Sequence, residues 1–497
     1  MSLIPLFVAI PLAGAFFTSL IGKRFKAAGG ILSNLATLAL TALSISFVSI
    51  VAKEGVIIYK VGGWPPPMGI SMVVDGLTSF MLVTVNMIAL LINIYSVNYM
   101  SRYTAQWKFF TLFMLMVAGM NGVIITGDIF NLYVFLEIAS IASYALVAFG
   151  IEHEELEASF KYAVMGSVAS SFIFLGILFL YSYTSTLNMA DMARTLLEKG
   201  PARVIGFVLP LFLAGFGLKA ALVPFHAWLP DAHPSAPAPI SAMLSGVLIK
   251  TLGIYALCRI FYNVIGMTSA LHSILMFMGA LSMVVGVFLA IGQWDLKRLL
   301  AYHSISQVGY VILGIGLGTP LGILGGLFHL FNHSVFKSLL FLNSGAVEYA
   351  TGTRDLQKMG GLSSVMPVTG ATNLIASMSI AGIPPFNGFW SKLIIIVACI
   401  QAGRLGYAFW AVLASILTLA SFMKVMKYGF YGKLGEGLAR IKEAPVFMKL
   451  SMAALAVICL AGGLLLVSGL NEVFLKAASG ALLQGTGYAD KVMLKVM

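Results

Sequence analysis

The chain has 497 residues, of which 60% are apolar and 10% are charged, and its formal net charge is +12. A soluble globular protein carries about 25% charged residues, so these charges are too few to coat the surface of a soluble protein of this length. The composition excludes a disordered chain and an ordinary soluble enzyme, and it indicates a protein that crosses a membrane many times.

Fourteen segments are apolar and long enough to cross a bilayer, since a spanning helix needs about 20 mostly apolar residues. The first is followed, not preceded, by its positive cluster, so we interpret it as a retained span and not as a secretory signal. The predicted segments are 3–21, 31–51, 74–97, 109–126, 129–150, 159–183, 204–223, 240–261, 271–291, 299–318, 321–347, 367–402, 406–431 and 449–468. The seventh runs into Pro224 and the twelfth contains Gly382-Ile383-Pro384-Pro385, so both are predicted to be broken.

Spacings between polar residues indicate an internal duplication. Glu137 and His303 are separated by the same stretch of sequence as Tyr144 and Tyr310, and nearly the same stretch separates Lys219 from Lys392 and Lys250 from Lys424. Segments 5, 7 and 8 therefore map onto segments 10, 12 and 13, and a shift of five, an odd number, places the two copies in opposite orientations. The two broken segments correspond to each other, and broken helices in matching positions are typical of a transport site.

The predicted fold class is an all-α polytopic membrane protein with about 14 transmembrane helices. Two inverted five-helix repeats comprise segments 4–8 and 9–13. The expected domains are residues 1–108 (helices 1–3), 109–265 (first repeat), 266–432 (second repeat) and 433–497 (helix 14 and the tail).

The distribution of basic residues predicts the orientation. Loops that follow segments 1, 3, 5, 9, 11 and 13 hold 16 Lys and Arg residues, and the opposite side holds 10. The positive-inside rule then places both termini on the outer side of the cell membrane. Most of the basic residues are explained by topology, so nucleic acid is not an expected partner. The cysteines, Cys258, Cys399 and Cys459, are isolated in apolar stretches, so we expect no metal or cofactor site in this chain.

Five ionisable side chains interrupt the apolar segments, and these are Glu137, Lys219, Lys250, Lys337 and Lys392. A charge at the centre of a bilayer costs about 2.5 to 3.5 kcal/mol even on insertion scales. Bland alternatives are a hydrogen-bonded protonated acid for Glu137 and snorkelling of Lys219 past Pro224. A desolvated lysine can exchange a proton near neutral pH, and a nearby carboxylate favours its charged form. If Glu137 lay close to Lys219, the two would form a switch without a cofactor.

A histidine–lysine row follows in segment 11. His329, His333 and Lys337 are spaced i, i+4 and i+8, which places them on one helical face. Three proton-exchanging groups on one stripe favour a proton relay; structural hydrogen bonding and a metal site are the alternatives, and the metal lacks further ligands. The candidate accessory residues are Asp128, His226, Asp231, His303 and Lys424.

At these residues the sequence resembles the antiporter-like, proton-translocating membrane subunits of complex I, Mrp sodium/proton antiporters and membrane-bound hydrogenases. The stretches that carry the resemblance are Phe130 to Glu137, LKAALVPFHAWLPDAHPSAPAPISAMLSGVLIK (218–250), AYHSISQVGY (301–310), HLFNHSVFKSLLFL (329–342) and GIPPFNGFWSK (382–392). The segment PDAHPSAPAPISA looks most like the D-type protein of Mrp antiporters and its antiporter-like counterpart, the H-type protein, in membrane-bound hydrogenases. The resemblance assigns Glu137 and Lys219 to a first half-channel. It assigns Lys250 and the row from His329 to Lys337 to a central connection, and Lys392 to the exit.

The resemblance implies an antiporter-like subunit of a multisubunit ion-translocating complex that moves protons, with sodium as a further candidate ion. Catalytic chemistry is not expected in this chain; redox centres, if the complex has them, would lie in partner subunits. The expected partners are other antiporter-like and small helical membrane subunits, a peripheral redox arm and the lipid bilayer. A stand-alone secondary cation/proton antiporter is the alternative, and an inert scaffold is disfavoured by the cost of the buried lysines.

Overall fold

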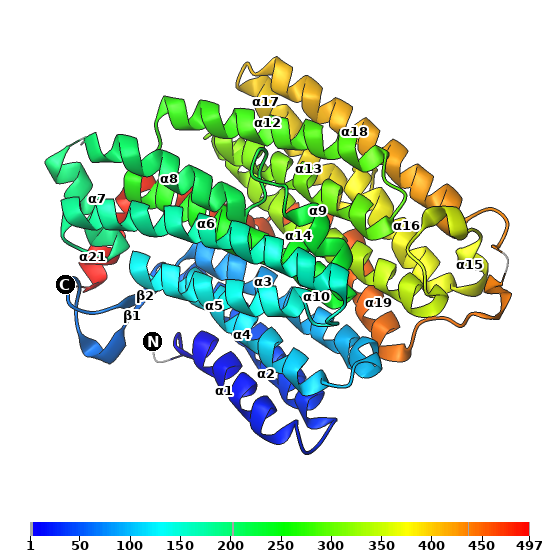
Figure 1. The fold of residues 1–497 in the computed structure, drawn as a ribbon. Coiled ribbons are helices and arrows are strands. Elements are labelled where there is room, and N and C mark those ends of the chain that lie inside the picture. Colours follow the sequence, from blue (N-terminus) through cyan, green and yellow to red (C-terminus); the bar gives the residue numbers. More distant parts are fainter. Residues whose placement is uncertain (1–2, 201–202, 436, 497) are drawn as a thin grey trace.

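The computed structural model describes residues 3–200, 203–435 and 437–496, and it is a bundle of helices that run largely side by side (Figure 1). Both chain termini lie at the same end of the bundle (Figure 1). This end, which we call the terminal end, also holds a two-stranded antiparallel sheet of β1 (Ile57–Lys60) and β2 (Ser71–Val74). We call the other end, which contains Arg102 after α3 and Tyr349 near the end of α14, the opposite end; the Arg102 guanidinium lies 3.4 Å from the centroid of the Tyr349 ring.

The helices in chain order are α1 (Leu6–Ile21), α2 (Ala28–Glu54), α3 (Gly76–Tyr99), α4 (Gln106–Ile125), α5 (Ile129–Val147), α6 (His153–Thr184), α7 (Met189–Lys199), α8 (Arg203–Lys219), α9 (Leu229–Ser235), α10 (Ala238–Met243), α11 (Ala256–Cys258), α12 (Ser269–Ile291), α13 (Leu296–Gly316), α14 (Pro320–Thr351), α15 (Leu362–Val365), α16 (Pro367–Ala381), α17 (Asn387–Gln401), α18 (Leu405–Val425), α19 (Val446–Ala461), α20 (Ala477–Leu483) and α21 (Tyr488–Val496).

The all-α polytopic fold class is confirmed. Among the described residues, ten helices are long and apolar enough to cross a membrane. They are Ala28–Glu54, Gly76–Arg102, Gln106–Ile125, Ile129–Val147, His153–Thr184, Ala238–Ile265, Ser269–Ile291, Leu296–Gly316, Leu405–Phe430 and Val446–Leu466. The other four predicted segments coincide with α1, with α8, with α14 and with the pair α16 and α17. The count of 14 spans and the domain boundaries stay predictions.

Both predicted breaks are present. Helix α8 ends at Lys219, and the next helix, α9, begins only at Leu229. Helix α16 ends at Ala381 and α17 begins at Asn387. The first break therefore starts earlier than the predicted end of segment 7, directly after the lysine.

The eighth span departs from a regular α-helix, which the apolar pattern did not predict. After α10, it contains π-helical turns at Leu244–Leu248, Lys250–Tyr255 and Arg259–Ile265. A π-turn shifts the hydrogen bonds to i→i+5 and is found mostly at functional sites. Gly253 permits close packing here, because a Cβ atom at this position would lie 2.5 Å from the backbone of Ala220 in the first break.

Backbone hydrogen bonds reveal the internal repeat directly. Two bonds join the start of α5 to the loop after α6, and two bonds at the equivalent positions of the second copy join the start of α13 to the loop after α14. They are Ile129 N–H to Leu187 C=O (2.9 Å) and Met189 N–H to Gly127 C=O (2.9 Å), then Leu296 N–H to Arg354 C=O (3.0 Å) and Leu356 N–H to Trp294 C=O (3.0 Å). Asp128 and Asp295, which occupy equivalent positions in the same register, cap the two helices. The first set lies beside β2, where Gly127 N–H donates to Ser71 C=O, and the second lies at the opposite end, as an inverted repeat requires.

The residues after the last span also fold, although no element was predicted there. Helices α20 and α21 return to the terminal end, where α21 packs against α7 and β1. Asn263 Nδ2 donates to the Ala481 and Gly485 carbonyls, each at 3.0 Å. The tail therefore covers the end of the eighth span.

A buried ion pair joins α3 to the eighth span. Arg259 Nη1 and Nη2 donate to the two carboxylate oxygens of Asp75 at 2.8 and 2.9 Å, and both side chains are at most 5% exposed. Burial acts to raise the pKa of the Asp75 carboxyl, but the Arg259 guanidinium and the Thr78 N–H outweigh it and hold the pKa below its usual value. Arg259 is thus a fold-stabilising residue and not the loop charge that was counted for topology.

Breaking this pair is expected to destabilise the protein, because the remaining partner becomes an uncompensated buried charge. Arg259→Met should lower the free energy of unfolding by about 3 to 5 kcal/mol, and the double variant Asp75→Asn/Arg259→Met should recover a large part of the loss. Thermal unfolding in detergent measures both. Glu198→Gln, which removes an exposed pair with Arg194, is the control and should leave Tm unchanged. Equal Tm values for the single and double variants would show that the two charges are not coupled.

Candidate functional site

Glu137 and Lys219 form an ion pair between α5 and the last residue of α8. Lys219 Nζ lies 3.8 Å from Glu137 Oε1, and the side chains are 5% and 27% exposed. Lys219 Nζ also donates to Ser140 Oγ at 2.9 Å, and Ser170 Oγ donates to Glu137 Oε1. The proximity on which the switch hypothesis depends is present. The ammonium of Lys219 points to α5 and does not snorkel to the bilayer surface.

An aromatic stack walls this pair on the side of the break. Tyr144 OH lies 3.4 Å from Lys219 Nζ, and its ring meets the Tyr162 ring edge-on at 4.6 Å. The Tyr162 ring stacks on the Trp228 indole at 4.2 Å, and Trp228 Nε1 donates to the Leu218 carbonyl at 3.0 Å. Trp228 therefore satisfies a carbonyl that the end of α8 leaves free.

Lys250 is completely buried in the π-helical part of the eighth span. Its Nζ donates to the Ser245 and Gly246 carbonyls at 2.5 and 2.8 Å. In the described parts of the chain it has no carboxylate within ion-pair distance. The backbone of its own helix solvates the ammonium, which leaves the lysine free of a fixed counter-charge.

The row of His329, His333 and Lys337 is also fully buried. His329 Nδ1 lies 2.9 Å from Ser391 Oγ and Nε2 lies 3.2 Å from Gln307 Oε1, so this ring bridges α17 and α13. The rings of His329 and His333 lie nearly parallel, 6.3 Å apart. Both His333 ring nitrogens and Lys337 Nζ lack a hydrogen-bond partner among the described residues.

Lys392 lies beside the second break. Its Nζ donates to the Ile380 carbonyl at 2.7 Å and to Ser415 Oγ at 3.3 Å, and it lies 4.8 Å from the centroid of the Tyr310 ring. Lys392 and Ser415 border a cavity of about 240 Å³ between α17 and α18. Tyr310 and Tyr144 thus contact the lysine of their own repeat copy.

The accessory residues are dispersed. Asp128 is a helix cap at the terminal end, and Asp231 pairs with Lys161 at 3.3 Å and Arg298 at 3.7 Å at the opposite end. His303 Nε2 lies 2.8 Å from Ser421 Oγ, and Lys424 Nζ donates to the Ile291 and Gln293 carbonyls, both at 2.6 Å. His226 lies in the first break, and its Nδ1 has no partner among the described residues.

Three buried or partly buried ionisable residues were missed from the sequence. Lys297, counted as a loop charge, is 2% exposed and lies 2.9 Å from Glu348. The His233 ring is fully buried, and neither ring nitrogen has a partner in the described part of the chain. The PDAHP segment contained this histidine, but hydropathy does not reveal that a short helix folds back into the bundle.

The family described as NADH:quinone oxidoreductase/Mrp antiporter, TM, matches residues 126–418 of this chain. A second family description, NADH-Ubiquinone oxidoreductase (complex I), chain 5 N-terminus, matches residues 65–110. The NADH-quinone oxidoreductase subunit N of Desulforudis audaxviator is 39% identical over 393 residues, which are 78% of each chain. The D-type protein of the Na(+)/H(+) antiporter of Alkalihalophilus pseudofirmus is 35% identical over 433 residues, which are 87% of each chain.

Solved structures resemble the whole chain. A chain of the Mrp complex from Dietzia sp. superimposes with a TM-score of 0.91 at 28% identity and covers 99% of both chains. A chain of the membrane-bound sulfane sulfur reductase, an archaeal respiratory membrane complex, gives a TM-score of 0.89 at 32% identity and covers 100% of both chains. Both are multisubunit membrane complexes.

Proposed function

The chain belongs to the family of NADH:quinone oxidoreductase/Mrp antiporter membrane subunits, and on this premise we propose that it carries protons across the membrane as one subunit of a larger complex. The proposed path runs through Glu137, Lys219, Lys250, His329, His333, Lys337 and Lys392. The chain is a multi-pass membrane protein, and we place it in the cell membrane with both termini on the outer side.

One observation carries the proposal: four lysines, Lys219, Lys250, Lys337 and Lys392, lie at most 6% exposed inside apolar spans, and only Lys219 of these has a carboxylate in ion-pair range among the described residues. Each charge costs about 2.5 to 3.5 kcal/mol in the membrane, and leucine would pack better. A fold that needed only stability would not retain them; lysines that gain and lose a proton explain their cost.

Glu137 and Lys219 supply the switch. With Glu137 ionised 3.8 Å away, the ammonium form of Lys219 is favoured. When Glu137 is protonated or moves away, the lysine loses its counter-charge and releases a proton toward the eighth span. Lys250, held by carbonyls, and the unpartnered His333 and Lys337 are the next acceptors. Lys392, beside its cavity, is the last.

Sodium is a second candidate ion, because a relative carries the name of a Na(+)/H(+) antiporter. A sodium site needs several oxygen ligands, and in the described chain no three Asp, Glu, His or Cys side chains are grouped closely enough to hold a metal ion. The residues therefore favour protons as the ion that passes through this chain, and sodium transport would be assigned to the complex.

Partner subunits are proposed from the structural neighbours, which are multisubunit membrane complexes. They comprise other antiporter-like and small helical membrane subunits, and a peripheral redox arm if the complex is redox-driven. Redox centres would lie in those partners, because the three cysteines of this chain are buried and unpaired. Lipid covers the remaining surface, where many large apolar side chains are exposed.

Affinity purification of the tagged chain from native membranes tests the proposal, followed by proton-translocation assays of the recovered assembly. We expect other membrane subunits to co-purify, and their identity reveals what drives transport. If the chain is recovered alone and exchanges cations for protons in vesicles, the alternative of a stand-alone antiporter replaces the proposal.

A further inference from the structure

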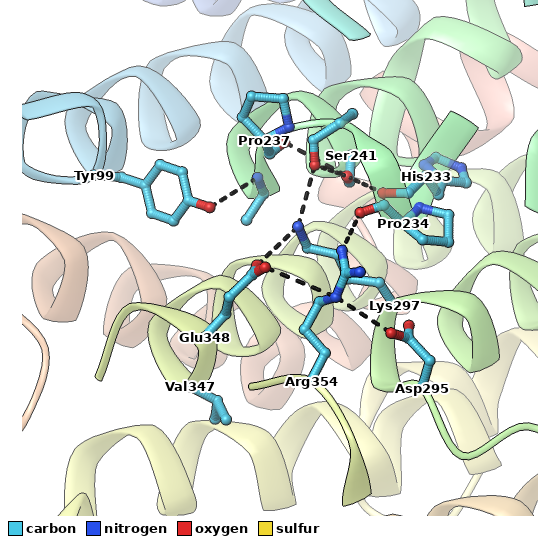
Figure 2. Close-up of polar contacts among 12 residues, drawn as sticks. Tyr99, His233, Pro234, Pro237, Ser241, Asp295, Lys297, Val347, Glu348 and Arg354 are labelled. Atoms are coloured by element: carbon cyan, nitrogen blue, oxygen red, sulfur yellow. Dashed lines mark hydrogen bonds and ion pairs between the residues drawn. The ribbon is translucent and has the colours of Figure 1, made fainter. Parts of the chain in front are cut away.

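A second lysine–carboxylate pair lies at the opposite end of the bundle (Figure 2). Lys297 Nζ, from the first turn of α13, lies 2.9 Å from Glu348 Oε2 of α14, and the side chains are 2% and 26% exposed. These exposures match those of Lys219 and Glu137, which are 5% and 27%. Both sites thus combine a buried lysine with a carboxylate that remains partly accessible.

Arg354 connects this pair to the surface (Figure 2). Its Nε lies 3.7 Å from Glu348 Oε1 and 3.2 Å from Asp295 Oδ2, and its Nη1 donates to the Pro234 carbonyl. Arg354 and Asp295 line a charged cavity of about 250 Å³ between α6, α9 and the start of α13. Carboxylates and bases alternate around this cavity, which also contains Glu154, Glu157, Lys161, Asp231 and Arg298.

The inverted repeat shows that the local fold does not require these charges. The same two backbone hydrogen bonds and the same aspartate cap form in the first copy, at the terminal end. There, in the register that aligns Asp128 with Asp295, the positions of Lys297, Glu348 and Arg354 are occupied by Phe130, Tyr181 and Leu187. The turn is therefore compatible with uncharged side chains, and the ionic cluster belongs only to the copy at the opposite end.

On its inner side the pair reaches the central row. Lys297 Nζ also donates to the Ala236 carbonyl at 3.1 Å, directly after α9. Helix α9 carries His233, whose buried ring lies 4.8 Å from the Phe341 ring. Lys337 Nζ lies 5.5 Å from the centroid of the same Phe341 ring, on the other side of the central row. Lys297 thus lies between the charged cavity and the unpartnered His233.

We propose that Lys297 and Glu348 form a proton-loading site that passes protons from the opposite end of the molecule to His233 and the central row; this inference rests on the proposed function. A proton from the aqueous side neutralises Glu348. Lys297 loses its counter-charge and passes one proton from Nζ toward a ring nitrogen of His233. Glu348 then returns its proton to the neutral amine, so one proton has moved inward and the pair is restored. Arg354 is a positioning residue that holds Glu348 and Asp295. The other ionisable groups around the pair are Tyr95, Tyr99, Glu155, His233 and Asp295.

The alternative is a purely structural anchor that ties α9 to α13 and α14. Lys297→Arg separates the two roles, because arginine keeps the positive charge and the ion pair but does not release a proton. We would assay the intact complex in inverted membrane vesicles with a pH-sensitive dye and check assembly by native gel electrophoresis. Lys358→Arg is the matched control, since Lys358 forms an exposed pair with Asp355 near the same end.

A proton-loading site predicts that Lys297→Arg and Glu348→Gln each slow translocation at least about tenfold in a fully assembled complex, and that Glu348→Asp retains part of the rate. Normal translocation by assembled Lys297→Arg would overturn the inference and leave a structural anchor. If Lys297→Arg does not assemble, the ratio of Glu348→Gln to Glu348→Asp rates decides, and equal rates refute the site. Lys219→Ala, assayed in parallel, distinguishes the two levels. If it also translocates normally, the proposed function fails; if it alone is inactive, only the loading site fails.

Discussion

Replacing Lys219 with alanine is expected to slow proton translocation by about a hundredfold or more, the usual effect of removing an acid–base group, while the complex still assembles. The lysine is the last residue of α8, and its Nζ contacts Glu137 and Ser140. Alanine removes the proton carrier and the partner of Glu137. The carboxylate, 27% exposed and still bonded to Ser170, can be protonated, so no buried charge remains to unfold the site.

Glu137→Gln tests the same switch from the other side, because glutamine keeps the hydrogen bonds and loses the charge. We expect a comparable loss of translocation with normal assembly. Lys358→Ala, an exposed lysine at 73% side-chain exposure, is the control and should behave as the wild type. Normal translocation by both Lys219→Ala and Glu137→Gln would remove the switch from the mechanism.

Lys250→Met is the second change with a large expected effect, because Lys250 joins the two repeats. Methionine fills a similar volume but cannot hold a proton, so transfer between Lys219 and the row of His333 and Lys337 should stop. Translocation should fall by about a hundredfold, and assembly of the complex should be retained, since the Ser245 and Gly246 carbonyls can return to backbone hydrogen bonds within the helix.

Thr251→Val is the matched control for this segment. Thr251 neighbours Lys250 in the same π-turn, is equally buried, and its Oγ1 donates only to the Val247 carbonyl at 3.0 Å among the described contacts. We expect its translocation to stay close to that of the wild type. If Thr251→Val loses as much activity as Lys250→Met, the segment is sensitive to packing and the role of the lysine is not supported.

The amino-acid pattern predicted the features that depend on local composition. Apolar runs indicated the spans, Pro224 and the Gly382–Pro385 motif indicated the two breaks, and the i, i+4 spacing placed His329 and His333 on one face. The inverted repeat was visible because its polar residues recur at nearly constant spacing. The hydrogen bonds at the helix starts align Asp128 with Asp295, a register that differs by a single position from the one that pairs Tyr144 with Tyr310.

Features that depend on tertiary covering could not be predicted. Lys297 follows Asp295 at the start of a span, where a lysine is usually solvated; it is buried because the chain after α9 folds over it and supplies the Ala236 carbonyl. Arg259 is buried because Asp75, distant in the sequence, faces it. The π-turns around Lys250 arise from packing against α8 at Gly253, and no single residue type encodes an i→i+5 bond.

The central claim is that the buried lysines exchange protons and do not act as fixed positive charges. The most direct test is the translocation rate of the Lys219→Arg complex in vesicles, because arginine preserves the charge beside Glu137 but stays protonated. We predict that an assembled Lys219→Arg complex translocates as poorly as Lys219→Ala. A wild-type rate for Lys219→Arg would show that a permanent charge suffices, and it would contradict proton transfer through this lysine.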